Sequence, residues 1–271
     1  MFVQSTSTRP TAQARVGAGP VSGCRHYPDT GARPAPLSGY GRVSPDIQVR
    51  WCKSFENPMT IKHFWIDPYA TSHQTTVTSV DGCEIELEST IFFAFSGGQE
   101  SDKGSISDIP VISARKEGLR IKYTLPANHG LEVGRFVCIE IDWSRRYRLM
   151  RLHFAAELVL ELIYNKLSGT EKIGAHIAQE KSRIDFVWPH SISSILPAVS
   201  EEANKIISSD LPIHNGFDDF ENERRYWEID GLSRVPCGGT HVRSTGEIGQ
   251  IRLKRNNIGR GKERVDIYLC N

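Results

Sequence analysis

Long apolar runs, paired cysteines and an N-terminal apolar segment are all missing from this chain of 271 residues. No stretch reaches the length of about 18 apolar residues that a membrane-spanning helix needs. The N-terminus lacks the apolar core of a secretory signal, so we expect none. The six cysteines are scattered without a CxxC pair, and a chain of this length does not need disulfides to be stable. We therefore expect reduced thiols and a cytoplasmic protein without a membrane partner.

An excess of charge of one sign is also missing. The 33 Lys and Arg residues nearly balance the 32 Asp and Glu residues, and the formal net charge is +1. This balance gives no sign of a nucleic-acid partner, although basic residues can still gather on one face of such a protein. Apolar residues make up 39% and charged residues 24%, which is typical of a globular protein. The length suits two modest domains or one large one, and it leaves the oligomeric state open.

Residues 1–58 differ from the rest in composition. They hold half of the 14 prolines, carry more basic than acidic residues and show no helical or strand period. Such a segment buries too little apolar surface to offset the entropy of ordering, so we expect a disordered leader. It fits a flexible tail, an acid-poor organellar transit peptide, or untranslated sequence upstream of a start at Met59. We favour the third interpretation because a regular pattern begins at Met59.

Residues 59–144 have the pattern of short β-strands. Asp81-Gly82 lies between two apolar runs and is a strong signal for a two-residue hairpin turn. Short strands with close turns predict a small β-barrel-like domain or a sandwich. The expected strands are His63–Asp67, Gln74–Val80, Cys83–Leu87, Ile91–Phe95, Gly104–Ile109, Val111–Lys116, Leu119–Thr124 and Phe136–Ile141.

Residues 145–271 change period and predict an α+β domain. Apolar residues about one helical turn apart predict a helix over Tyr147–Leu167, which Ser168-Gly169 would end. A second amphipathic helix is expected over Ser193–Ser208. The expected strands are Ile173–Ala178, Arg183–Val187 and 225–230, followed by a hairpin of Gly249–Arg255 and Glu263–Leu269. The fold class is therefore α+β, with a β-barrel-like domain followed by an α+β domain.

The sharpest local motif is Cys-Gly-Gly-Thr-His at residues 237–241. Thiolate and imidazole are suitable zinc ligands, and glycines permit the backbone to approach a ligand closely. His153 and Glu157 lie four residues apart on one face of the expected helix, where both can reach one ion. With Cys237 and His241 they make a plausible tetrahedral set. Two simpler interpretations stay open: a buried cysteine beside a surface histidine, and a solvated Glu157 that pairs with His153.

Several segments in the same order resemble one family over nearly all of residues 59–271. They are Phe64–Tyr69, the glycine-rich Ser96–Gly104, Arg151–Leu158, Ile173–Ile177, Ser182–Phe186, Cys237–His241, Gly246–Gly249 and Gly259–Val265. Together these segments are far more specific than any one of them. The chain is similar to the trans-acting alanyl-tRNA editing proteins, relatives of the editing region shared by alanyl- and threonyl-tRNA synthetases.

The resemblance implies hydrolysis, in trans, of the ester in mischarged aminoacyl-tRNA, with seryl- or glycyl-tRNA of the alanine type as substrate. It also implies tRNA as a partner and one zinc ion per chain, which polarises the carbonyl, generates hydroxide or orients the substrate. The implied zinc ligands are His153, Glu157, Cys237 and His241. The implied catalytic residues are Gly238, Gly239 and Thr240, the glycines as backbone oxyanion donors. The implied substrate or tRNA contacts are Gly97, Gly98, Gln99, Asp102, His176, Arg183, Arg260 and Lys262.

The chain departs from the family pattern at three positions. Glu157 replaces the second histidine of the first zinc motif; a carboxylate can still ligate zinc but makes it a weaker Lewis acid. Phe154 replaces a threonine, adding bulk and removing a hydroxyl, and Ser96 replaces the first glycine of the glycine-rich segment. These departures keep a second hypothesis open, a metal-free and non-catalytic tRNA-binding module.

Two further features bear on these hypotheses. A full synthetase is not expected, because the chain is too short for an added catalytic domain and has no nucleotide-binding glycine loop. Basic residues gather near the C-terminus, where they fit either contacts to acceptor-stem phosphates or a solvated hairpin. They are Lys254, Arg255, Arg260, Lys262 and Arg264.

Overall fold

The computed structural model describes residues 59–270, which lie in one compact unit. The expectations for residues 1–58 fall outside this described part. Two clusters of buried apolar side chains organise it, one from residues 64–141 and one from residues 149–269. Strands predominate and two α-helices are present in the described part, so the predicted α+β class is confirmed.

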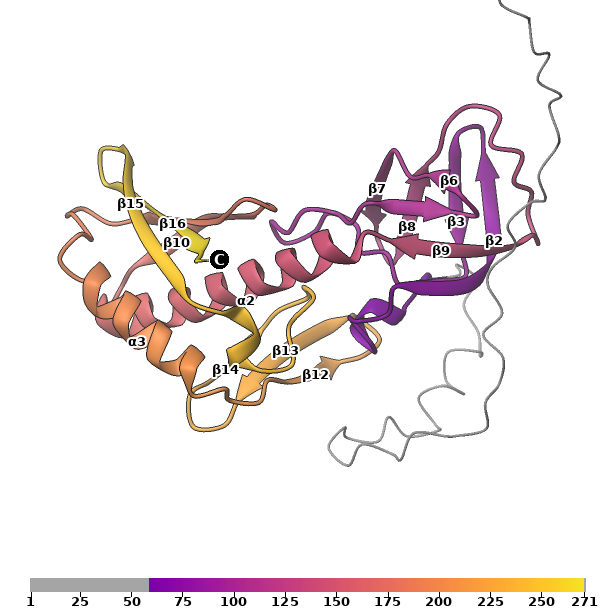
Figure 1. Ribbon diagram of the computed structural model, residues 1–271. Coiled ribbons are helices and arrows are strands. Elements are labelled where there is room, and N and C mark those ends of the chain that lie inside the picture. Colours follow the sequence, from indigo (N-terminus) through magenta and orange to yellow (C-terminus); the bar gives the residue numbers. More distant parts are fainter. Residues whose placement is uncertain (1–58, 271) are drawn as a thin grey trace, which may run out of the picture. The chain divides into compact units, whose positions relative to one another are not determined.

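The first half is built on a seven-stranded sheet of order β6-β5-β9-β2-β3-β8-β7, in which every pairing is antiparallel (Figure 1). β2 pairs with β9 through its first half and with β3 through its second, with a register shift between Val77 and Ser79. β6 and β7 remain edges, so the sheet is an open, half-barrel form of the expected barrel. Its strands are β2 (Ser72–Asp81), β3 (Glu84–Leu87), β5 (Gly104–Ile106), β6 (Ile109–Pro110), β7 (Ser113–Glu117), β8 (Arg120–Thr124) and β9 (Phe136–Ile141).

The predicted hairpin at Asp81-Gly82 is confirmed: Asp81 pairs with Glu84, and Gly82 has the positive φ of 58° that the turn requires. Two predicted strands are wrong. His63–Asp67 contains a 3-10 helix, η1 (His63–Trp65), which follows the short strand β1 (Ile61–Lys62). β1 instead pairs in parallel with β4 (Ser89–Thr90).

The second wrong strand is Ile91–Phe95, which lies outside the named strands. Residues 91–94 all have buried apolar side chains. A short apolar run in the sequence does not show whether its backbone pairs in a sheet. The backbone N–H of Phe93 donates to a carboxylate oxygen of Asp102 at 2.7 Å, so a side chain takes the place of a strand partner.

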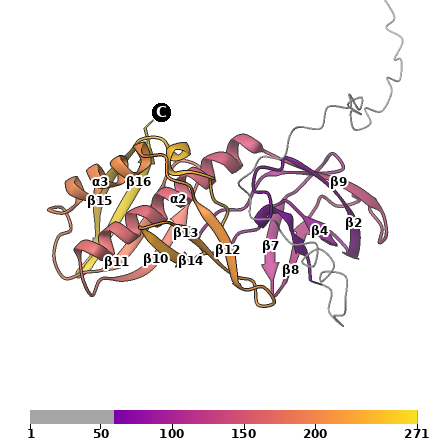
Figure 2. The ribbon, with the colours of Figure 1, turned by 90° about the horizontal axis from the view of Figure 1, so that it is seen from below.

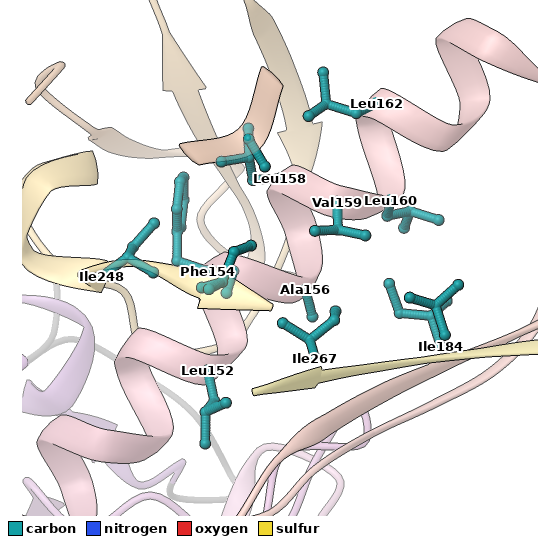
Figure 3. Close-up of a cluster of buried hydrophobic side chains, with 14 of the residues drawn as sticks. Leu152, Phe154, Ala156, Leu158, Val159, Leu160, Leu162, Ile184, Ile248 and Ile267 are labelled. Carbon is teal, nitrogen blue, oxygen red and sulfur yellow. The ribbon is translucent and has the colours of Figure 1, made fainter. Parts of the chain in front are cut away.

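Helix α2 (Trp143–Lys166) is the centre of the second half. It begins at Trp143 and not at Tyr147, because the Asp142 side chain caps it by accepting a hydrogen bond from the Arg145 backbone N–H. Its middle is buried on opposite sides: in Figure 3 Phe154 faces Ile248, while Ala156 faces Ile267. A helix buried all round needs packing elements on more than one side.

Two sheets and a helix cover α2 (Figures 1 and 2). A four-stranded antiparallel sheet has the order β10-β11-β16-β15, and a three-stranded antiparallel sheet has the order β12-β13-β14. Their bounds are β10 (Glu171–Ile177), β11 (Ser182–Val187), β12 (His214–Asp219), β13 (Arg224–Ile229), β14 (Ser233–Pro236), β15 (Ile251–Gly259) and β16 (Lys262–Leu269). Helix α3 (Leu196–Ser208) packs against α2 and β15, and the short 3-10 helix η2 (Thr245–Ile248) against α2 and α3. No helix within residues 59–270 combines the length and apolar character needed to cross a bilayer.

Candidate metal centre

Three side chains from two distant segments meet in the buried interior. His153 lies on α2, while Cys237 and His241 lie in the segment between β14 and η2; one ligand atom from each falls within 4.8 Å of the others. The Sγ atom of Cys237 is 3.3 Å from Nε2 of His153 and 3.2 Å from Nε2 of His241. Tetrahedral zinc would separate sulfur and nitrogen ligands by about 3.5 Å, from its usual bond lengths. The donor set and its spacing therefore fit a zinc ion.

The second nitrogen of each imidazole is held by an amide oxygen. Nδ1 of His153 lies 2.5 Å from Oε1 of Gln99, and Nδ1 of His241 lies 2.6 Å from Oδ1 of Asn215. Since an amide oxygen only accepts, each Nδ1 carries a proton, and Nε2 is the ring nitrogen that faces Cys237 and is placed to bind a metal. Metal-binding histidines typically have such partners. Asn215, on β12, has no motif around it that sequence reasoning could have found.

Glu157 lies beside this cluster. Its Oε1 is 3.4 Å from Nε2 of His153 and 3.8 Å from Sγ of Cys237. Its Oε2 accepts a hydrogen bond of 3.3 Å from the Trp227 indole. The Glu157 side chain is only 14% exposed, so the solvated interpretation is wrong, although the pairing with His153 is present. The surface interpretation of His241 is also wrong, since that residue is 3% exposed.

The electrostatics of the cluster favour a cation. Burial lowers the pKa of His153, but the adjacent Cys237 and Glu157 outweigh it and raise that pKa to about 10. Burial, with smaller effects from His153 and Arg225, holds the pKa of His241 well below its usual value. Burial also raises the pKa of Glu157, but hydrogen bonding and attraction to His153 outweigh it and lower the pKa. Without a metal, one proton on His153 therefore compensates the acidic groups around it.

The glycines of the Cys-Gly-Gly-Thr-His motif let the backbone pass the imidazole. A Cβ atom on Gly239 would lie 1.8 Å from Cε1 of His153, so no larger residue fits without displacing the ring. Next to it, the Thr240 hydroxyl accepts a hydrogen bond of 2.8 Å from the Gln99 amide, and the Thr240 N–H donates to Gln99 Oε1 at 3.3 Å. Gln99 therefore links the motif to His153.

The glycine-rich segment is fixed against β10. Gly98 has φ +88°, and a Cβ there would approach the carbonyl oxygen of Ala175 to 2.5 Å. Its own carbonyl accepts a hydrogen bond of 2.8 Å from Ile177 N–H, and Glu100 N–H donates to the Ile177 carbonyl. These backbone bonds carry the Gln99 side chain to the metal cluster, where it is fully buried.

Comparison with known proteins identifies the family of this fold and site. Residues 226–266 match the family described as the threonyl and alanyl tRNA synthetase second additional domain. The chain is 33% identical over 216 residues to an alanyl-tRNA editing protein AlaX-M of Pyrococcus horikoshii, covering 78% of this chain and 98% of that protein. The chain belongs to the alanyl-tRNA editing proteins.

Other relatives agree with this assignment. The AlaX-M protein of Saccharolobus solfataricus is 31% identical over 233 residues, which cover 76% of this chain and 98% of that protein. An alanine–tRNA ligase of Ignicoccus hospitalis is 31% identical over 258 residues, covering 83% of this chain but only 27% of the ligase. The similarity therefore spans the whole of the free-standing editing proteins and a minor part of the ligase.

Phe154 is a buried side chain that packs beside the metal cluster. Its side chain is 0% exposed. The ring makes edge contacts with Trp227, at 5.0 Å between centroids, and with His241, at 5.5 Å. The phenyl ring, at the position where the resemblance implies a threonine, is therefore accommodated by packing against aromatic neighbours.

Several predicted substrate-contact residues already have partners within the protein. Asp102 is buried and receives hydrogen bonds from the Arg146 guanidinium and from Phe93 N–H. Arg183 pairs with Asp185, and Nε2 of His176 lies 3.4 Å from a Glu100 oxygen. Gly97 is different, because its φ of +59° is accompanied by open space at the Cβ position.

The basic residues near the C-terminus divide into two groups. Arg255 pairs with Glu263, and Arg264 pairs with Asp185, so these charges are compensated. Three others are exposed and form no ion pair with a described carboxylate. They are Lys254 within β15, Arg260 in the turn that follows β15, and Lys262 at the start of β16.

Proposed function

We propose that this chain hydrolyses the ester bond of mischarged aminoacyl-tRNA in trans, with zinc held by His153, Cys237, His241 and Glu157. The observation that carries the proposal is the buried cluster of ligand atoms, in which Gln99 and Asn215 leave both Nε2 atoms available. Family membership supplies the reaction class. The substrates proposed are seryl- and glycyl-tRNA of the alanine type, with correctly charged alanyl-tRNA spared.

Glu157 is the fourth ligand in this proposal, added to the group of His153, Cys237 and His241 that the structure brings together. Its Oε1 already lies at ligand-to-ligand distance from both His153 and Cys237, and the Trp227 indole holds its other oxygen. When bound, zinc would supply Lewis-acid polarisation of the ester carbonyl, an acidified water or orientation of the substrate. Gln99 keeps the His153 ring oriented, and the backbone N–H of Gly239 is a candidate donor to the oxyanion.

The proposed tRNA contact is made by the basic residues of the hairpin that form no ion pair with a described carboxylate. Lys254, Arg260 and Lys262 are exposed on the β15–β16 hairpin without an ion pair to any described carboxylate. Side chains of this kind bind phosphates and fix orientation without reading sequence. The synthetic pocket of an alanine ligase cannot reject near-isosteres by binding alone, which explains why a separate hydrolysis step is useful.

The test combines metal content with deacylation. Protein expressed with sufficient zinc should contain one zinc per chain and release serine or glycine from tRNA of the alanine type faster than alanine. Cys237→Ala should lose both zinc and activity, while Cys83→Ala, at an exposed position, should keep both. Absence of zinc and of deacylation, with tRNA binding retained, would overturn the proposal in favour of a non-catalytic binding module.

A further inference from the structure

Two side chains, one from the 3-10 helix η1 and one from β13, hold the carbonyl groups of the Cys-Gly-Gly-Thr-His turn. The indole Nε1 of Trp65, in η1, donates a hydrogen bond of 2.9 Å to the carbonyl of Gly238. Nη1 of Arg225, on β13, donates one of 3.1 Å to the carbonyl of Gly239. Both consecutive carbonyls are thereby fixed from outside the turn.

Fixing a carbonyl also fixes the N–H of the same peptide. A trans peptide is planar and its C=O and N–H point in opposite directions, and residues 59–270 contain no cis peptide. The bond to Arg225 directs the Thr240 N–H away from the guanidinium, and it is found on Gln99 Oε1. In the same way the Trp65 bond directs the Gly239 N–H away from the indole.

The Gly239 N–H differs from that of Thr240 in having no hydrogen-bond partner among the described residues. It nevertheless lies beside the metal cluster, since the side-chain direction of Gly239 points at the His153 ring. A free backbone donor next to a Lewis-acid site is the arrangement that stabilises a developing oxyanion.

Arg225 is an unusual residue to place at such a turn. It is 5% exposed, and among residues 59–270 its Nε has no hydrogen-bond partner and its guanidinium forms no ion pair with a carboxylate. Its guanidinium lies over the rings of Trp65 and Phe217, at 5.3 and 5.4 Å from their centroids. An unpaired buried cation is costly to folding. The two ring contacts and the attraction to the nearby Cys237 offset part of this cost, and they hold the guanidinium at the turn.

We propose that Trp65 and Arg225 are positioning residues that orient the Gly238–Gly239 and Gly239–Thr240 peptides, so that the Gly239 N–H donates to the oxyanion of the ester. This inference rests on the proposed hydrolase function. It assigns the segment that precedes the seven-stranded sheet a direct part in arranging the reaction centre, because Trp65 belongs to η1.

The first test is Trp65→Phe, which removes the N–H donor and keeps a ring against Phe64 and Phe217. We expect kcat to fall about tenfold or more, with KM and zinc content unchanged, because loss of one oxyanion donor costs about 10²–10³. The amide signal of Gly239 in an NMR spectrum of the metal-loaded protein should shift. Trp65→His, which restores a ring donor, should recover part of kcat.

Arg225→Lys is the second arm, and it should lower kcat in the same way without changing KM. The double variant should cost less than the product of the two single effects, since both side chains act on one turn. Trp188→Phe and the exposed Arg234→Lys are the matched controls and should match the parent protein.

Each other outcome overturns the inference. Unchanged kcat in both variants, on an active parent protein, would reject the positioning role and leave the hydrolase function standing. A rise in KM alone would assign these residues to substrate binding, and loss of zinc would assign them to the metal site. An inactive parent protein would remove the proposed function and the inference with it.

Discussion

At the scale of single residues, Glu157 is the proposed zinc ligand at the position where the resemblance implies a histidine. If Glu157 ligates zinc, Glu157→Ala should weaken zinc binding by about tenfold or more, while Glu157→His should restore or tighten it, since imidazole suits zinc well. Competition with a chelating dye measures the dissociation constants. Glu161→Ala is the matched control, because Glu161 lies one turn along α2 and accepts a hydrogen bond from Ser233. Equal zinc affinity of Glu157→Ala and the parent protein would exclude Glu157 as a ligand.

Phe154 offers a second test at this scale. Its ring is fully buried between Trp227 and His241, so Phe154→Thr should leave a cavity and place a hydroxyl in apolar surroundings. We expect the free energy of unfolding of the metal-free protein to fall by about 3 kcal/mol, measured by urea denaturation. Phe154→Leu should cost less, because it removes less volume and adds no polar group. A stability equal to that of the parent protein would show that the ring is not part of the core.

At the scale of elements, the β15–β16 hairpin carries the proposed tRNA contact. Replacing Lys254, Arg260 and Lys262 together by alanine should raise KM for aminoacyl-tRNA about tenfold and leave kcat unchanged. The salt dependence of binding should flatten, because each lost phosphate contact removes about 0.7–0.9 from the logarithmic slope. Arg115→Ala is the control, since Arg115 lies on β7 and is paired with Glu84. An unchanged KM and salt slope would show that these three side chains are solvated and do not contact tRNA.

The elements that the sequence predicts well are those with a clear period or turn signal. The helix at α2, the β10–β11 pair and the final hairpin are confirmed, although the strands of that hairpin are longer than predicted. β12 and β14 were missed because His-Asn-Gly-Phe-Asp-Asp and Ser-Arg-Val-Pro have no apolar alternation. Both strands pair with β13, which lies between them in the sheet.

In the candidate site too, the sequence predicts only the residues that stand in a recognisable local pattern. The three meeting residues and Glu157 stand in recognisable spacings, so the sequence predicts that they come together. Asn215, Trp227 and Arg225 stand in no motif, because their roles depend on β12 and β13 being placed beside α2 by tertiary packing. Sequence spacing therefore finds residues that share a local segment, and it misses partners that tertiary packing brings to the site from other segments of the chain.

At the scale of the whole molecule, a bound metal would connect segments that are far apart in the chain. His153 and Cys237 are 84 residues apart, so the proposed ion joins α2 to the turn between β14 and η2. Such a site does not exist in the unfolded chain, and its binding energy therefore adds to the stability of the fold. With free zinc at about 1,000 times its dissociation constant, this contribution is about 4 kcal/mol. Removal of zinc by a chelator should accordingly lower Tm by about 10 °C.

The coupling between zinc binding at His153 and the stability of the fold predicts that this stability depends on pH. In the metal-free protein the pKa of His153 is raised to about 10, so this group is protonated at pH 8 when folded but neutral when unfolded. Its contribution to stability is complete below about pH 6.5 and is lost as pH rises through 10. Zinc must displace this proton, so binding at pH 8 should release about one proton from His153, measured by calorimetry in buffers of different ionisation enthalpy. The chelator-induced loss of Tm should then increase between pH 7 and 9. Zinc binding without proton release, and a Tm difference independent of pH, would contradict the link between His153, the metal and the fold.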